Sequence, residues 1–535
     1  MHHRNQLLLC AVAVAMACFV LFATFAGCRP AETPYHNFLT LRLSSNPTTL
    51  DPALITDVSG GIIAAKLFNG LVRFDDALNI VPDIAESWTI AQDQRTYTFR
   101  IRKQVHFSNG REVTAQDFQY SFERILDRKT RAPLTWVLDR IEGSREFMEG
   151  TTPRLAGVSA PDEYTLVIRL SKPFAPFLAL LGMTTASVVP REESQQLGES
   201  FGSMPVGTGP YVLREWRMGQ DIVLDSRKDY FGGAPRLNGI RYRIIPEDLT
   251  AVMEFETGRL DILTIPASEF RRYTTDAKWK DRVQGKAGLN CYYLGMNCSR
   301  PPFNDIRMRQ AVSYAIDRRR ILEKIYEGRG TLASGPVPPL LRTYRISQEN
   351  MLFDPYPYDP EQARSLITSA GWSGKTVTLQ VSAEPEVLDI VEVLQHYLRQ
   401  AGLSVRIVQL DWSAFKQAVN RGDAEAFWLS WWADYPDPEN FLFPLFHSAN
   451  IGPGGNRSRY SNPELDRLIE RAQSTVDEKL RHRLYRTAER RIIADAPWIF
   501  MWNRADYSVV QPWIADYRIP ALYSVDKGLN VSKTP

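Results

Sequence analysis

Hydrophobic and polar residues alternate in several short stretches of the chain, which is the pattern of half-buried β-strands. Between residues 95 and 107, Tyr97, Phe99 and Ile101 share one face while charged side chains take the other. Residues 38–43 alternate in the same way, before prolines break the pattern. Further strands are expected within 163–170, 237–248, 291–298 and 375–382.

Other stretches repeat their hydrophobic residues at helical spacing. A helix after Thr114, its expected N-cap, would bury Phe118, Phe122 and Ile125 together with Ser121. Residues 309–326 read as one amphipathic helix, with Arg318, Arg319 and Arg320 on its solvent side. Two more helices are predicted by the stripes Ala363, Leu366, Ile367, Ala370 and Leu465, Leu468, Ile469, Ala472. Because strands and helices alternate along the chain, the fold class is α/β.

The first 27 residues have the features of an export signal. Arg4 precedes an apolar run from Leu7 to Ala26. The small residues before Cys28 resemble a bacterial lipoprotein processing site, in which the cysteine is lipidated and becomes the new N-terminus. An uncleaved membrane anchor is the alternative, because the run is about long enough to span a bilayer.

The composition narrows the class of partner. Without the leader the chain has 63 basic and 61 acidic side chains, so no nucleic acid or other polyanion is implied. Of the five cysteines only Cys291 and Cys298 reach the folded part, and seven strand residues would hold their sulfurs roughly 23 Å apart. Both are expected to be free thiols. The aromatic content, with 12 tryptophans, suits a concave binding surface.

Motifs for catalysis, metal binding or phosphate binding are absent from the sequence. The G-x-S-x-G motif of serine hydrolases does not occur. In 206–211, "VGTGPY", Pro210 blocks the helix that a dinucleotide site needs. No histidine after the leader has a partner at a recognised metal-site spacing: His36, His106, His396, His447 and His482. We therefore expect neither enzyme activity nor a metal or cofactor.

Several long blocks together resemble one family. Residues 82–125, "PDIAESWTIAQDQRTYTFRIRKQVHFSNGREVTAQDFQYSFERI", are similar to a block that marks extracytoplasmic solute-binding proteins of the peptide and nickel class (family 5), which serve ABC importers. The blocks "PVGTGPYVL", "FNDIRMRQAVSYAIDRRRI" and "WWADYPDPENFLFPLF" follow in the family's order. The departures are mild: Ile84 replaces leucine, and Asn109 replaces the usual aspartate before Gly110.

The resemblance implies a two-lobed, periplasmic-binding-protein-like (type II) clamp with an additional inserted domain. Lobe I would comprise 28–57, 203–290 and 500–535. The additional domain would comprise 58–202, and lobe II 291–499. The ligand would lie between the lobes.

The resemblance also implies a site around residues 428–434, "WLSWWAD". Asp434 would pair with the α-ammonium group of a peptide, in a crevice with aromatic walls. Trp431, Trp432 and Ala433 would offer backbone groups to an extended ligand. Trp412 would line a pocket, and Thr56, Asp57 and Val58 would face them across the cleft. Trp428 stands where relatives can place an arginine for the ligand carboxylate. The alternative is that the tryptophans belong to a core and that Asp434 stabilises the turn before Pro436.

The expected function is that of a lipid-anchored, monomeric receptor in the periplasm or another extracytoplasmic space, which presents short peptides to an ABC transporter permease. A nickel chelate or an oligosaccharide in place of the peptide stays open. A cell-envelope hydrolase is the remote alternative, for which the sequence offers no pair of nucleophile and base.

Overall fold

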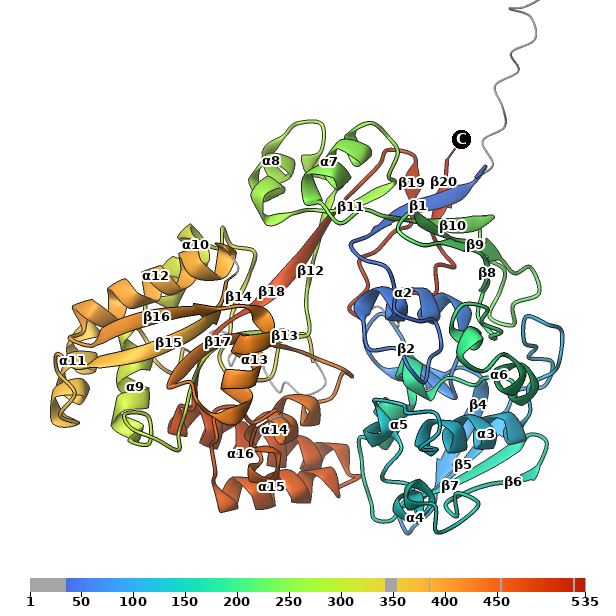
Figure 1. The fold of residues 1–535 in the computed structure, drawn as a ribbon, viewed down its shortest axis with the longest axis horizontal. Coiled ribbons are helices and arrows are strands. Elements are labelled where there is room, and N and C mark those ends of the chain that lie inside the picture. Colours follow the sequence, from blue (N-terminus) through green and yellow to red (C-terminus); the bar gives the residue numbers. More distant parts are fainter. Residues whose placement is uncertain (1–34, 342–353, 384, 453–454, 523–524, 535) are drawn as a thin grey trace, which may run out of the picture.

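A computed structural model describes residues 35–341, 354–383, 385–452, 455–522 and 525–534. The predicted leader 1–27 and the predicted lipidation site Cys28 lie outside these residues. Within them the protein has two bodies of mixed helix and strand, which Figure 1 shows on the left and on the right. No helix among the described residues is long and apolar enough to cross a membrane.

The upper part of the right-hand body is a four-stranded sheet in the order β1-β10-β9-β8. β1 pairs with β10 in parallel, and the other pairs are antiparallel. Leu39, Tyr211, Leu224 and Ile240 are buried in its core with residues of α2. The bounds are β1 (Phe38–Leu43), β8 (Tyr211–Arg217), β9 (Asp221–Ser226), β10 (Gly239–Ile244) and α2 (Val58–Leu67).

The lower part of the right-hand body is an antiparallel sheet in the order β4-β5-β7-β6. Tyr97, Phe99 and Ile101 of β5 are buried, as their alternation predicted. The bounds are β2 (Val72–Phe74), β3 (Ile80–Pro82), β4 (Ala85–Ile90), β5 (Thr96–Ile101), β6 (Val158–Asp162), β7 (Thr165–Arg169), α3 (Ala115–Leu126), α4 (Ser144–Glu149), α5 (Phe177–Leu181) and α6 (Arg191–Leu197).

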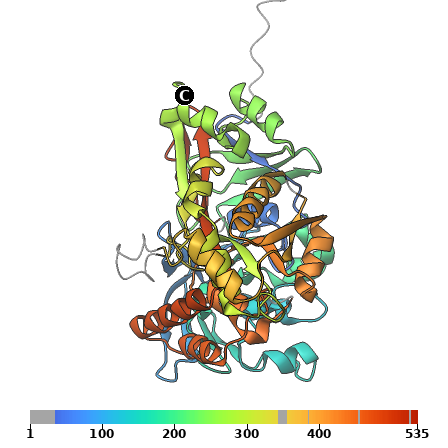
Figure 2. The same ribbon diagram turned by 90° about the vertical axis from the view of Figure 1, so that its left-hand side faces the viewer.

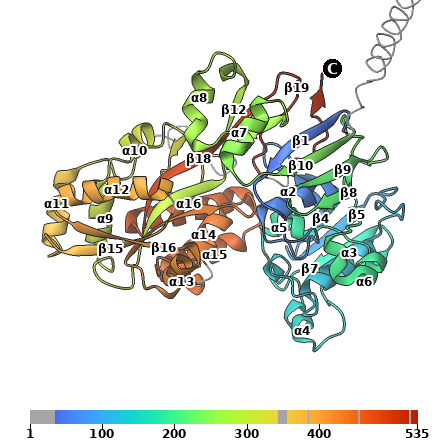
Figure 3. The ribbon, with the colours of Figure 1, turned by 45° about the horizontal axis from the view of Figure 1, so that its top comes forward.

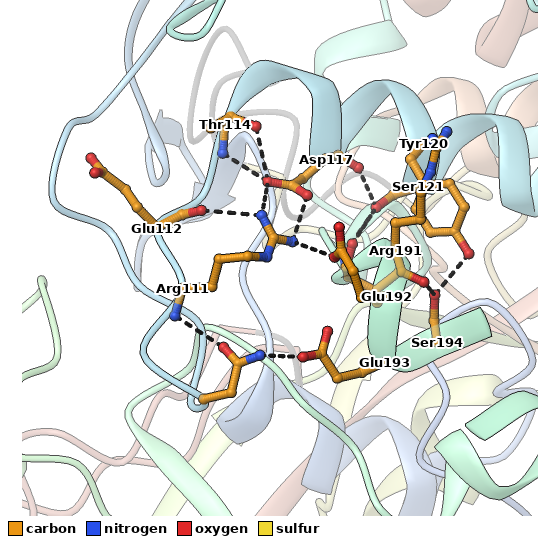
Figure 4. A network of polar contacts seen from close by, with 12 residues as sticks. Arg111, Glu112, Thr114, Asp117, Tyr120, Ser121, Arg191, Glu192, Glu193 and Ser194 are labelled. Atoms are coloured by element: carbon orange, nitrogen blue, oxygen red, sulfur yellow. Dashed lines mark hydrogen bonds and ion pairs between the residues drawn. The ribbon is translucent and has the colours of Figure 1, made fainter. Parts of the chain in front are cut away.

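A polar network fixes the start of α3, and Figure 4 shows its members. The Asp117 carboxylate accepts hydrogen bonds from the backbone N–H and the hydroxyl of Thr114, at 2.9 and 3.1 Å. It also accepts two bonds from the Arg111 guanidinium, which lies 3.3 Å from Glu192 of α6. Thr114 is the N-cap, as predicted. This part of the family-like block therefore serves the fold.

Asn109, which departs from the family pattern, belongs to the same network. Its amide nitrogen donates to the carboxylate of Glu193 in α6. Its amide oxygen accepts a bond of 3.1 Å from the Arg111 N–H. An aspartate at this position could accept from Arg111 but could not donate to Glu193. An asparagine at this position thus suits the acid on the neighbouring helix.

The left-hand body is built on the larger part of an eight-stranded sheet in the order β11-β18-β13-β17-β15-β16, and β12 and β14 also pair with β18. β15, β16 and β17 run parallel, whereas β13 and β18 are antiparallel to their neighbours. The bounds are β11 (Ile262–Thr264), β12 (Val283–Ala287), β13 (Asn290–Met296), β14 (Gly330–Leu332), β15 (Thr376–Ser382), β16 (Ser404–Leu410), β17 (Ala426–Trp432) and β18 (Trp498–Val510).

Helices cover both faces of this sheet. Residues of α9 to α12 form one hydrophobic cluster with it, and residues of α13 to α16 form another on the opposite face. The bounds are α9 (Ile306–Ala315), α10 (Arg318–Lys324), α11 (Pro360–Ser369), α12 (Pro385–Gln400), α13 (Trp412–Arg421), α14 (Glu439–Phe446), α15 (Pro463–Gln473) and α16 (Glu478–Asp495).

The prediction of one helix over 309–326 is wrong. Ile316 is extended, and Asp317 caps a second helix by accepting a bond of 2.9 Å from Arg320 N–H. Placing Arg318 on the solvent side is also wrong. Its side chain is buried, where its guanidinium donates to two backbone carbonyls and to Asp354. The break therefore serves to satisfy a buried arginine.

The two bodies are joined by long strands. β18 begins in the left-hand body, where it pairs with β13, and its second half pairs with β11 and β12. Figures 2 and 3 show β18 and β12 rising side by side toward α7 (Asp248–Glu256) and α8 (Phe270–Thr275). The boundary that we expected between 499 and 500 falls inside β18. Away from these strands the bodies also touch, since Ala175 N–H donates to the Gln473 carbonyl at 2.8 Å.

Candidate functional site

The candidate site lies at one edge of the left-hand sheet. Because β15, β16 and β17 are parallel, their carboxyl ends share this edge, which is where open α/β sheets bind ligands. Trp412 follows the end of β16 by two residues, and Trp432 is the last residue of β17. The topology therefore brings the two predicted tryptophan positions to the same edge.

The tryptophans of β17 differ in their surroundings. Trp428 is only 4% exposed and packs against Tyr292 and Trp502, so the core alternative describes it. Trp431 is half-buried, and its indole N–H has no hydrogen-bond acceptor among the described residues. Trp432 is 43% exposed, with its ring centroid 6.5 Å from that of Tyr292. Only the end of the strand thus presents tryptophan to solvent.

One backbone edge of β17 is open. The strand pairs with β13 along its whole length but with β15 only at Ala426 and Phe427. Between Trp428 and Trp432 no described strand pairs with the other edge. Unpaired backbone groups of this kind can hold an extended chain as an added strand.

Asp434 lies just beyond the end of β17, and its position is fixed by Asn440 of α14. The Asn440 amide oxygen accepts a bond of 2.9 Å from Asp434 N–H, and its nitrogen donates to the Asp434 carboxylate at 3.3 Å. The Ala433 N–H is already bonded to the Leu289 carbonyl at 2.8 Å. No ion pair to Asp434 exists among the residues that the structure describes.

The electrostatics of Asp434 are those of a partly enclosed acid. Its side chain is open to solvent, and it does not lie deep in a crevice as expected. Even so, desolvation by the surrounding protein raises the pKa of its carboxyl above the ordinary value, and the Asn440 bond opposes this. Solvent therefore reaches the carboxylate, while the surrounding protein disfavours its charged form.

Trp412 begins helix α13 and is 54% exposed. The Lys416 ammonium, one turn later, lies 5.3 Å from the centre of its ring. Phe415 on the same helix is buried in one cluster with residues of β17, against which Trp431 and Ala433 pack. The same hydrophobic cluster thus supports Trp412 and the end of β17.

Thr56, Asp57 and Val58 lie at the start of α2 in the right-hand body. Asp57 is the N-cap: its carboxylate accepts from Gly60 N–H and from the Thr48 hydroxyl, both at 2.7 Å. Val58 is 65% exposed. The Asp57 carboxylate therefore serves the helix, and Val58 offers an apolar surface.

Tyr292 and Arg504 also lie at this edge and were not predicted as site residues. Tyr292 of β13 contacts Trp432, and its hydroxyl lies 3.4 Å from the Arg504 guanidinium of β18. The Asn290 side chain fixes the Arg504 backbone with bonds of 2.7 and 3.0 Å. The alternation of 291–298 indicated the face of Tyr292, but no local signal connects Arg504 to it.

Other chemistry is not evident in the described residues. Cys291 and Cys298 are free, as predicted, and burial raises the pKa of the Cys298 thiol to about 11. No group of three histidine, cysteine or acidic side chains within the described ranges could hold a metal ion. The candidate site thus consists of one acid, exposed aromatic rings and an open backbone edge.

Comparison with protein families decides the class. The model for bacterial extracellular solute-binding proteins, family 5 (middle region), matches residues 79–453. The chain belongs to this family. It is a solute-binding receptor of the extracytoplasmic kind that serves ABC importers, and it is not an enzyme.

Relatives in this family cover nearly the whole chain. Heme-binding protein A of Haemophilus influenzae is 29% identical over 524 residues, which is 94% of this chain and 93% of that protein. The periplasmic oligopeptide-binding protein OppA of Escherichia coli is 29% identical over 486 residues, 88% of each chain.

A solved structure confirms the predicted fold. The periplasmic murein tripeptide-binding protein MppA, in an unliganded open form, has a TM-score of 0.80 at 26% identity. The match covers 93% of this chain and 97% of that one. The two-lobed α/β clamp with an additional domain is therefore the fold of this chain.

Proposed function

We propose that this receptor captures short peptides outside the cytoplasm and delivers them to the permease of an ABC importer. The observation that carries the proposal is Asp434, a crowded carboxylate without a cationic partner among the described residues. A peptide's α-ammonium group would supply the missing cation.

The energetics favour this pairing. When the lobes close, water leaves the cleft, and a buried charge without a partner costs several kcal/mol. The Asp434 carboxylate and an ammonium group would each neutralise the charge of the other. The open edge of β17 between Trp428 and Trp432 supports an extended backbone beside the acid, because strand addition fixes main chain without regard to sequence.

The likeness to an open, unliganded relative supports an open resting state. In that state Asp434 is reached by solvent, which agrees with its exposure. Closure would be a hinge motion about β12 and β18, bringing α2 with Val58 toward the site. The domain boundaries given above, the monomeric state and the site roles of Trp412, Trp431, Trp432 and Ala433 belong to this proposal.

Cys28 is proposed as the lipidated N-terminus after removal of residues 1–27. The support is the sequence pattern alone. A Cys28→Ser variant should be released from the cell envelope on gentle lysis, whereas the wild-type protein should stay with the membrane fraction.

Heme is the second candidate ligand, because a heme-binding protein is among the relatives that match nearly the whole chain. A heme carries two carboxylates, which Asp434 would repel, so the acid favours peptide. Mass spectrometry of the solute that copurifies distinguishes peptide from heme. It also identifies a nickel chelate or an oligosaccharide. A strong visible absorption band would mark heme at once.

Calorimetry with the tripeptide Ala-Ala-Ala tests the role of Asp434. The Asp434→Asn variant should bind at least tenfold more weakly, a loss of about 1.4 kcal/mol, with an unchanged thermal unfolding midpoint. An exposed acid in the same body, Glu323, gives the control Glu323→Gln. Equal affinity in Asp434→Asn and the wild-type protein would refute the assignment.

A further inference from the structure

Lys416, in the second turn of α13, is a partly buried lysine whose ammonium group has no acceptor among the described residues. Its neighbours Phe415 and Val419 are buried, and its own side chain is only partly exposed. No hydrogen bond or ion pair to Lys416 exists within the part of the chain that the structure describes, and its one defined contact is the face of Trp412.

Other lysines of this protein show that this is unusual. Lys66 is buried and pairs with Asp526 at 2.7 Å. Lys527 is part-buried and donates to the carbonyls of Ala65 and Phe68 at 2.8 and 2.7 Å. Lys375 lies over a tryptophan ring at 5.0 Å, but it is exposed. Of these four lysines, only Lys416 is partly buried and without an acceptor in the part of the chain that the structure describes.

The surroundings of Lys416 are cationic. Arg457 bonds to the Asn420 side chain at 3.0 Å, and Asn420 lies one helical turn after Lys416 on the same face. Burial, reinforced by the charge of Arg457, lowers the pKa of Lys416 to about 8. An anion placed here would relieve both effects.

The position of Lys416 suits a ligand held at Asp434. The end of β16, which α13 follows, and the end of β17, which Asp434 follows, lie at the same edge of the sheet, with β15 between the two strands. An extended tripeptide, about 10 Å long, spans two strand spacings of a sheet. A peptide anchored by its ammonium group at Asp434 can therefore carry a carboxylate to the first turns of α13.

We propose that Lys416 and Trp412 form an anion subsite that receives a carboxylate of the bound peptide, at either its C-terminus or an acidic side chain. Trp412 contributes a flat apolar wall, and Lys416 contributes the charge that fixes the carboxylate. The inference rests on the peptide capture proposed above and adds a preference for anionic peptides at a defined position.

Two pairs of peptides test the subsite and distinguish the sources of the carboxylate. Calorimetry compares Ala-Ala-Ala with its C-terminal amide, and Ala-Glu-Ala with Ala-Gln-Ala. In at least one pair the wild-type protein should bind the charged member at least tenfold more tightly. Lys416→Met should reduce this preference to less than threefold, and Lys416→Arg should retain it.

Lys375→Met, which removes an exposed lysine from a tryptophan face, is the matched control and should behave as the wild-type protein. The inference is overturned if Lys416→Met keeps a tenfold preference, or if the wild-type protein binds these peptides without preference in either pair. In that case peptide capture stands. If the wild-type protein binds none of the four, peptide capture falls and the subsite with it.

Discussion

The side-chain amide of Asn440 holds Asp434 by two hydrogen bonds, one to its backbone N–H at 2.9 Å and one to its carboxylate at 3.3 Å. Asn440 is buried in α14, so the acid takes its position from the helix that follows it. The same two bonds hold the turn after β17 and fix the position of the carboxylate. A role of Asp434 in the turn therefore does not exclude its proposed role in binding.

Asn440→Ala should weaken Ala-Ala-Ala binding by roughly fivefold, which is the effect of about one hydrogen bond. The loss should be smaller than in Asp434→Asn, because the carboxylate remains but is no longer held. Asn450→Ala is the control, since Asn450 donates to the Phe443 carbonyl at 2.7 Å and does not touch Asp434. If calorimetry shows unchanged affinity in Asn440→Ala, the amide does not position the acid.

The α/β fold could be predicted because its signals are local. Tyr97, Phe99 and Ile101 alternate, and all three are buried in one face of a sheet. The prediction of one helix over 309–326 failed because the helical spacing of hydrophobic residues continues through Ile316. The break at Ile316 depends on contacts with residues that are distant in the sequence. The Arg318 guanidinium donates to the carbonyls of Ala333 and Phe500. No pattern in the sequence around Arg318 indicates these hydrogen bonds.

The same limit applies to the site. Asp434 and Trp412 were predicted as site residues from the resemblance to the family. Periodicity alone would have assigned the tryptophans to a core, which is correct for Trp428. The spacing of Trp412 and Lys416 is visible in the sequence. That Lys416 has no acceptor among the described residues is a tertiary property, because it depends on which side chains the other elements bring near it.

Asp51 and Arg124 form a buried ion pair that ties the segment before α2 to α3. Arg124 donates to both carboxylate oxygens of Asp51, one bond being 2.9 Å long, and Asp51 is almost fully buried. Asp51→Asn should lower the free energy of unfolding by about 3–5 kcal/mol, because it leaves the guanidinium buried without its counter-charge. The urea unfolding midpoint measures this.

The double variant Asp51→Asn/Arg124→Met should recover part of that loss, since it removes the unpaired charge. Arg145→Met is the matched control, because Arg145 pairs with Glu149 at 2.9 Å on an exposed helix surface, where such pairs contribute little. A loss in Asp51→Asn no larger than in Arg145→Met would contradict the prediction.

The buried carboxyl group of Glu439 should make the stability of the folded state depend on pH. It begins α14 and is buried, where it accepts hydrogen bonds from the Tyr435 hydroxyl and, at 2.6 Å, from the Gln473 amide. Burial raises the pKa of its carboxyl to about 7, and the charge of Asp437 adds to this, whereas Arg140 and the two hydrogen bonds act against it. At neutral pH the acid is therefore half protonated in the folded state.

The direction in which stability changes with pH follows from proton binding. Between about pH 4.5 and pH 7 the folded state holds a proton on Glu439 that the unfolded chain has lost, so stability falls as the pH rises through this window. The fall amounts to about 3 kcal/mol, and it is complete above pH 7.

Glu439→Gln should remove this fall, because an uncharged amide needs no proton. In urea unfolding at pH 5, 6, 7 and 8, the stability of Glu439→Gln relative to the wild-type protein should increase as the pH rises. The control Glu323→Gln should differ from the wild-type protein by the same amount at every pH. A constant difference between Glu439→Gln and the wild-type protein across this range would mean that Glu439 titrates at its ordinary pKa.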